Sequence, residues 1–335
     1  MAATGQYSPF ITWDFTTLTT TFPYQQVNPL KMRNTTDTPA YIDEIRFLTQ
    51  YPVDPRAFVL VNLRMGNGTP LTRDYTPMWL LGSEFNRKLV ANPILSLATA
   101  TSAYVYQQRF RLARPILLAP QDDIVIELKL DTNFFAYLDT TIRTLGRENA
   151  NITIQTGLIG RSLPSNIEWP LKNDYPFVSF YRSPFFTFGT LTEYTTTLAD
   201  LQNPFQEELQ IEKFVGRMFV TSYDSYDINA VDPNEVAVTW KLTDNRGKII
   251  IRDFSNFAEI FHSSDSSWWN KTTMPPKSFY VGKLRVDTRA YAAGNAWPAY
   301  SSLVSPSLFD TAIIGYRSVD LAGQTNAYAA PPTDR

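Results

Sequence analysis

The sequence predicts an all-β fold of two tandem eight-stranded jelly-roll β-sandwiches with few short helices. Short runs rich in β-branched and aromatic residues predict strands, and turn signals separate these runs at regular spacing. An internal repeat divides the 335 residues into two similar units. Each unit offers roughly eight strand candidates, and eight strands in two packed sheets form a jelly roll.

The internal repeat is clearest in two stretches that share a proline turn, an alternating strand and a closing aspartate. They are LAPQDDIVIELKLD, residues 118–131, and MPPKSFYVGKLRVD, residues 274–287. Further matches follow in the same order: residues 11–29 with 186–204, 41–47 with 209–214, 61–75 with 238–254, and 158–163 with 313–319. In the last match, Gly160 corresponds to Gly315. Matches that keep one order indicate a duplicated unit.

The repeat predicts the domain organisation. We expect an N-terminal arm at 1–9, a first jelly roll at 10–163 with an insertion at 76–113, a connector at 164–184, a second jelly roll at 185–321 and a C-terminal tail at 322–335. Short helices are expected at residues 192–201 and 256–261. The core strands repeat and the loops do not, which is typical of a retained scaffold with divergent surface loops.

Composition excludes several classes of protein. The chain has no cysteine and one histidine, His262, so it has no disulfide, no Cys-His nucleophile and no His-rich zinc site. The net charge is −2 and no basic run is present, so we expect no direct nucleic-acid binding. No apolar run is long enough for a spanning helix, and no secretory signal precedes residue 30.

The sequence offers few candidate sites, and we expect no catalytic, cofactor-binding or metal site. The adjacent acids Asp122–Asp123 and Glu207–Glu208 are interpreted as surface turns. The acidic loop at 224–235 matches no EF-hand, so a solvated loop is the favoured interpretation over a calcium site.

The sequence leaves open the role of two tryptophans and the glycosylation of four sequons. Trp268 and Trp269 are candidate interface or receptor contacts, with coverage of their own core as the alternative. The sequons begin at Asn34, Asn67, Asn151 and Asn270, a number that a chain rich in Thr and Ser reaches by chance.

Two tandem jelly rolls with unequal insertions resemble the double jelly-roll major capsid proteins of tailless icosahedral viruses. This lineage includes tectiviruses and adenoviruses, and the chain is similar in size to its smaller prokaryotic-virus members. The resemblance covers residues 10–321 and rests on architecture and the repeat, without a diagnostic motif.

The resemblance implies a structural protein and not an enzyme. Three copies would form a homotrimer whose six jelly rolls make a pseudo-hexagonal capsomer. Partners would be neighbouring capsomers and minor capsid or penton proteins, with an underlying membrane left open. The protein would be located in the virion shell after assembly in the host cytoplasm.

Two alternative functions remain at this point. Paired jelly rolls also occur in glycan-acting amidases and glycosidases, which place acidic residues in the cleft between the rolls. A viral spike or carbohydrate-binding protein is the other alternative, with Trp268 and Trp269 as stacking platforms.

Overall fold

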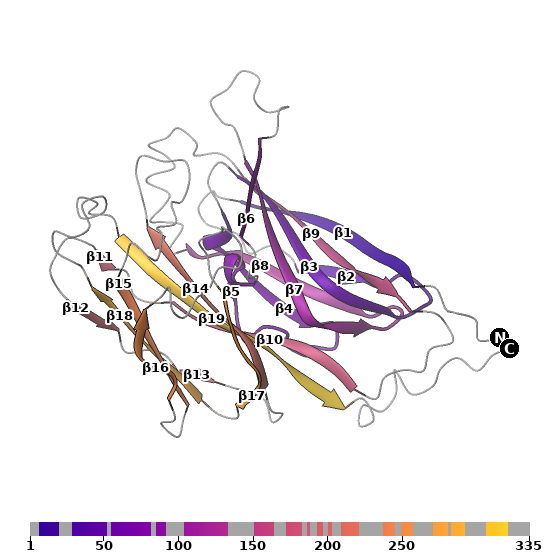
Figure 1. Ribbon diagram of the computed structural model, residues 1–335. Coiled ribbons are helices and arrows are strands. Elements are labelled where there is room, and N and C mark those ends of the chain that lie inside the picture. Colours follow the sequence, from indigo (N-terminus) through magenta and orange to yellow (C-terminus); the bar gives the residue numbers. More distant parts are fainter. Residues whose placement is uncertain are drawn as a thin grey trace, which may run out of the picture.

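The computed structural model confirms the all-β prediction, because almost all of its elements are antiparallel strands (Figure 1). The residues that the structure describes are 7–19, 29–51, 55–81, 85–91, 104–132, 151–163, 172–182, 186–187, 193–196, 200–202, 209–220, 237–244, 249–256, 271–280, 283–291 and 306–320. Within this part of the chain, none of the helices has the length and hydrophobicity needed to cross a membrane.

The first unit consists of a long sheet and a short sheet. The long sheet has the order β1-β9-β3-β7-β6, and the short sheet has the order β2-β8-β4-β5. The strand bounds are β1 Ser8–Leu18, β2 Leu30–Arg33, β3 Ala40–Tyr51, β4 Val59–Met65, β5 Thr76–Pro77, β6 Phe85–Ala91, β7 Tyr104–Leu118, β8 Asp123–Leu130 and β9 Ile152–Ser162. Two 3₁₀ helices, η1 (Pro55–Ala57) and η2 (Met78–Leu80), lie in the connections.

The second unit has the same two-sheet arrangement. Its long sheet has the order β10-β19-β14-β17 with β11 beside β19, and its short sheet has the order β12-β18-β15-β16 with β13 beside β18. The bounds are β10 Lys172–Arg182, β11 Phe186–Thr187, β12 Glu193–Thr196, β13 Asp200–Gln202, β14 Leu209–Val220, β15 Ala237–Asp244, β16 Ile249–Asn256, β17 Lys271–Tyr280, β18 Lys283–Tyr291 and β19 Pro306–Asp320.

The strand orders show that both units are jelly rolls. In each long sheet the first and last strands of the unit are neighbours, as β1 and β9 are in the first unit and β10 and β19 in the second. The next two strands of each long sheet also correspond, β3 to β14 and β7 to β17. This order is that of two interlocked Greek keys, which defines the jelly roll. The predicted fold class is therefore confirmed.

The structure also bears out the predicted correspondence of Gly160 and Gly315. Gly160 on β9 pairs with Ile42 and Gly315 on β19 pairs with Ile211, and a β-bulge follows directly on each partner strand. The extra residue in the bulge is Asp43 in the first unit and Glu212 in the second. A shared bulge at a shared glycine indicates that the two units have kept the same local geometry.

Strand pairing corrects three details of the predicted organisation. Strand β10 lies within residues 164–184, expected as a connector, yet it pairs with β19 along its whole length. Strand β7 includes residues 104–113 of the expected insertion and pairs with β3. The helix expected at residues 192–201 is replaced by β12 and β13, because Thr and Tyr in this stretch favour extended backbone. The remaining boundaries stay predictions.

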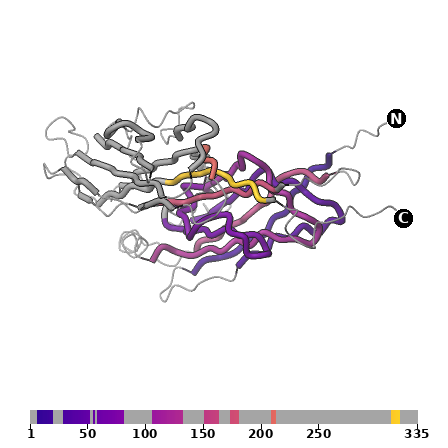
Figure 2. The backbone as a smooth tube through the Cα atoms, turned by 90° about the horizontal axis from the view of Figure 1, so that it is seen from below, coloured from indigo at the N-terminus to yellow at the C-terminus, as the bar shows by residue number. Residues whose placement is uncertain are grey.

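A continuous hydrophobic core includes residues of both units. In the first unit, Ile124 and Ile126 of β8 are fully buried. The same buried cluster includes Val178 of β10 and Ile314 of β19. Figure 2 shows these two strands of the second unit lying along the first. The two jelly rolls are therefore joined through their cores.

Candidate assembly surfaces

The junction between the units covers one face of β10 and β19. Cross-strand partners point to the same face of a sheet, so Val178 and its partner Ile314 lie together, as do Pro176 and its partner Tyr316. All four residues are buried. Alternate residues of a strand lie on the opposite face, toward the second unit's own short sheet. Strands β10 and β19 are thus buried on both faces, which an isolated jelly roll does not require.

Hydrogen bonds to backbone groups also cross the junction. The Asn173 side chain accepts a hydrogen bond from the backbone N–H of Leu117 and donates one to the carbonyl of the same residue, both at 3.1 Å. The backbone N–H of Arg73 donates to the carbonyl of Val178 at 2.9 Å. Because Asn173 and Leu117 are both buried, these bonds satisfy polar groups that water does not reach.

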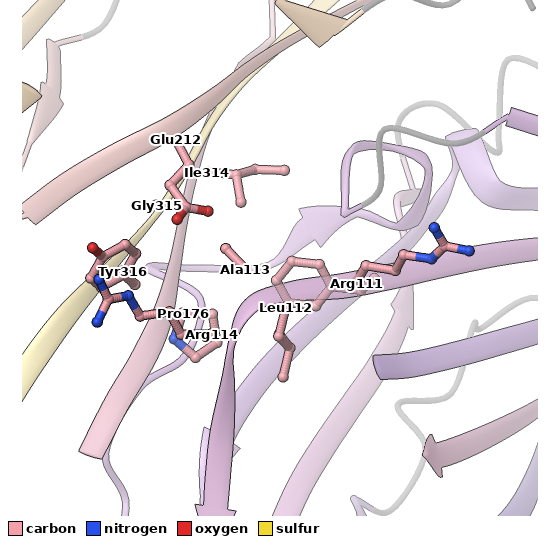
Figure 3. Close-up of a pocket in the computed structure, with 10 residues that line it drawn as sticks. Arg111, Leu112, Ala113, Arg114, Pro176, Glu212, Ile314, Gly315 and Tyr316 are labelled. Carbon is pink, nitrogen blue, oxygen red and sulfur yellow. The ribbon is translucent and has the colours of Figure 1, made fainter. Parts of the chain in front are cut away.

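Arg114 of β7 makes a charged contact across the junction (Figure 3). Its guanidinium forms an ion pair with Asp174 at 3.1 Å and lies 4.4 Å from the centre of the Tyr316 ring. Burial raises the pKa of Tyr316 above its usual value, and the nearby Arg114 charge opposes this effect. The cavity beside these residues has room for about one water molecule, so it is too small for an organic ligand.

Strand β1, at the edge of the first unit's long sheet, exposes a row of large apolar side chains. Tyr7, which directly precedes β1, is 52% exposed, Ile11 59%, Trp13 37% and Phe15 71%. These residues have the same parity, so Ile11, Trp13 and Phe15 project from one face of the strand. Among the described residues, they are the large hydrophobic residues that are exposed. An apolar row on an edge strand is typical of a surface that binds another protein.

A charged cluster lies farther along the same face of the long sheet. The Glu44 carboxylate accepts hydrogen bonds from Arg46 at 2.6 Å and from Arg109 at 2.7 Å, and Arg111 is 3.6 Å away. The Glu44 side chain is nearly buried beneath the three arginines. Burial disfavours its ionised form, but the hydrogen bonds from Arg109 and Arg46 outweigh burial and hold the pKa of Glu44 below its usual value.

Acidification is expected to weaken the fold through Glu44. Because its pKa is lower in the folded than in the unfolded state, its stabilisation is present above the unfolded pKa and is lost as the pH falls through the folded pKa. Glu44→Gln should reduce the free energy of unfolding by about 1–3 kcal/mol at pH 7. Urea unfolding at pH 7 and pH 3 should show the difference between wild type and variant shrinking at pH 3.

Asp37→Asn, which changes an exposed carboxylate, is the matched control for this measurement. It should leave the unfolding midpoint nearly unchanged at both pH values. An equal loss for Glu44→Gln at pH 7 and pH 3 would show that the ionised carboxylate does not stabilise the fold.

Several predicted site residues lie outside the described residues. These are Trp268, Trp269, His262, Glu207–Glu208 and the acidic loop at 224–235. The role of the two tryptophans as interface or receptor contacts therefore stays a prediction. Within the described residues, no group of three or more His, Cys, Asp and Glu side chains is placed to hold a metal ion.

The described acidic pair and sequons have definite positions. Asp122 lies in the turn before β8 and Asp123 is the first residue of that strand. Both are half-buried, and the carboxylate of Asp123 is 3.8 Å from Arg33. The sequon residues Asn67 and Asn151 are exposed, whereas Asn34 is fully buried. A glycan therefore does not fit on Asn34 in the folded protein.

Sequence reasoning missed both the junction between the two units and the exposed apolar row on β1. Ile11, Trp13 and Phe15 alternate with other residues, a pattern that normally predicts a buried face. The junction was missed because β10 was assigned to a connector. The signal for β10 was present, since residues 176–180, PFVSF, are similar to residues 9–13, PFITW.

The sequence matches no protein-family model and no curated protein. Several solved structures are similar to nearly the whole chain. A crystal structure of PBCV-1 VP54, fitted into a reconstruction of the virophage Sputnik, has 8% identity and a TM-score of 0.49, covering 97% of this chain and 98% of that one. A structure from Sulfolobus Turreted Icosahedral Virus has 14% identity and a TM-score of 0.45, covering 92% and 90%.

The major capsid protein of Bacteriophage PM2 is a third similar structure. It has 9% identity and a TM-score of 0.40, and the likeness covers 93% of this chain and 100% of that one. The TM-scores of these structures are below 0.5, so the assignment of the double jelly roll rests on the strand pairing of this chain.

Proposed function

We propose that this protein is the major structural subunit of an icosahedral virus shell. In this proposal three copies form a trimer, and its six jelly rolls make a pseudo-hexagonal capsomer. The observation that carries the proposal is the joining of two jelly rolls of one topology into a single body with a shared core. A body with two like units presents nearly repeating surfaces to its neighbours, as a tiling subunit requires.

The remaining partners follow from this role. Neighbouring capsomers and minor capsid or penton proteins would contact the trimer, and the protein would be located in the virion after assembly in the host cytoplasm. The exposed row on β1 supports self-association, because obligate interfaces are more apolar than ordinary surfaces. The structural likenesses to viral capsid proteins agree with this role.

The mass of the purified protein in solution tests the proposal. Light scattering should give three times the chain mass of 38.2 kDa without added ligand. Negative-stain images should show particles with a six-sided outline. A monodisperse monomer at high protein concentration would overturn the proposal, and screening for glycan binding would then follow.

A further inference from the structure

The two long sheets can be aligned residue by residue at their first and last strands. In the first unit Pro9 pairs with Arg161, the residue after Gly160. In the second unit Pro176 pairs with Tyr316, the residue after Gly315. The alignment therefore places residues 9–13, PFITW, on residues 176–180, PFVSF. Ile11 corresponds to Val178, and it has the same kind of partner, an isoleucine of the last strand.

The aligned faces differ in how they are covered. Val178 is fully buried, but its counterpart Ile11 is 59% exposed. On the last strands, Tyr316 is 6% exposed, whereas its counterpart Arg161 is an exposed residue. The residues are similar in kind over much of this face, so the difference comes from the neighbour that covers it. In the second unit this neighbour is the first unit, whereas no described residue of the single chain covers the face of Ile11 in the same way.

The covering element is the end of β7, residues 110–117. Phe110 to Arg114 line the junction with Pro176 and Tyr316, and Leu117 is bound by Asn173. The counterpart of this segment is in β17. On one side of the bulge, Ile116 pairs with Ile42 in the first unit, and Ser278 pairs with Ile211 in the second. On the other side, Arg111 pairs with Glu44 in the first unit, and Thr273 pairs with Lys213 in the second. Both spacings place Arg114 of β7 at the position of Pro276 in β17.

We infer that the outer face of β1 and β9 binds a second copy of this chain, through β17 of that copy's second unit. This inference rests on the proposed trimer and assigns its interface. The contact within one chain joins a first unit to a second unit, and the inferred contact joins a second unit to the next first unit. Repetition of such a head-to-tail contact produces a ring when the rotation closes. The exposed row of Tyr7, Ile11, Trp13 and Phe15 would then be covered in the assembly.

Charged variants of the most exposed residues test the inference. Ile11→Glu and Phe15→Glu, each made separately, place a charge in an apolar interface without altering the buried core. Each should raise the concentration at which trimers dissociate by about a hundredfold or more. The control Thr35→Glu adds the same charge at an exposed turn elsewhere and should leave the trimer intact. Light scattering over a dilution series measures the assembly, and circular dichroism checks the fold.

Cross-linking provides a second test that does not depend on a destabilising change. The chain has no cysteine, so introduced thiols react without background. A double variant, Arg161→Cys with Pro276→Cys, treated with a short bismaleimide should give covalent species that end at three chains. Each single variant should give no such ladder.

The outcomes separate the inference from the proposed function. Dissociated Ile11→Glu and Phe15→Glu variants together with the cross-linked ladder support both. If the wild type and both charged variants form trimers, and the double cysteine variant gives no ladder, the inferred interface is wrong but the proposed trimer is supported. A monomeric wild type overturns both.

Discussion

Gly160→Ala and Gly315→Ala should each reduce the free energy of unfolding by at least about 3 kcal/mol. A Cβ atom at Gly160 would lie 1.8 Å from the carbonyl oxygen of Tyr41, and one at Gly315 would lie 2.0 Å from that of Gln210. Both obstructing atoms are backbone atoms beside a β-bulge, so no side-chain rotation can relieve the clash. The strands must separate, and this breaks pairing at the centre of each long sheet.

Urea unfolding of the purified variants measures this loss. Gly68→Ala is the control, because Gly68 has a φ of +89° but no neighbouring atom within 4 Å of an added Cβ. Its cost should be only about 1–2 kcal/mol, from the left-handed backbone. Equal costs for Gly160→Ala and Gly68→Ala would contradict the close approach of β9 to β3. Equal effects at Gly160 and Gly315 are expected, since both units have the same bulge.

Asn34→Ala should have the second large effect, a loss of about 2–4 kcal/mol. The Asn34 amide nitrogen donates to the carbonyls of Thr38 at 2.9 Å and Leu118 at 3.1 Å. Its side-chain oxygen accepts hydrogen bonds from the backbone N–H and the hydroxyl of Thr36. The residue is fully buried, so an alanine leaves the Leu118 carbonyl without its amide donor and leaves a small cavity.

Asn34→Asp distinguishes the loss of the amide from the loss of volume. A carboxylate has nearly the shape of the amide, but when ionised it places negative charge against two carbonyl oxygens. It should therefore cost at least as much as Asn34→Ala at pH 7. The exposed sequon residue Asn67 supplies the control, and Asn67→Ala should change stability by less than about 1 kcal/mol. Thermal melts of all three variants suffice, and a harmless Asn34→Ala would contradict the buried network.

The last strand of each unit could be matched from the sequence because it contains a glycine, Gly160 or Gly315, that no other residue can replace without a clash. Gly160 and Gly315 lie where a side chain cannot fit, so the position is recognisable in both copies. The strands themselves were predictable from β-branched and aromatic runs. The strand order was confirmed only by pairing, because sequence periodicity gives faces and not neighbours.

The first strand of the second unit was misplaced for a physical reason. Residues 11–29 were matched to 186–204 through their threonines, and many strands accept threonine at outward positions. Pairing shows that the counterpart of β1 is β10. The candidate surface could not be predicted at all, since Phe10 and Ile11 are both apolar and only the packed sheet shows which one is buried.

The adjacency of first and last strands has a consequence for how the protein is made. Ser8 pairs with Ser162 in the first unit, and Lys172 pairs with Asp320 in the second. A ribosome adds roughly 5–20 residues per second, so each first strand waits about 7–30 s for its partner to emerge. Neither long sheet can close until its last strand, β9 or β19, has been synthesised. Chains interrupted before β19 would expose unpaired strands, and these would depend on chaperones to stay in solution.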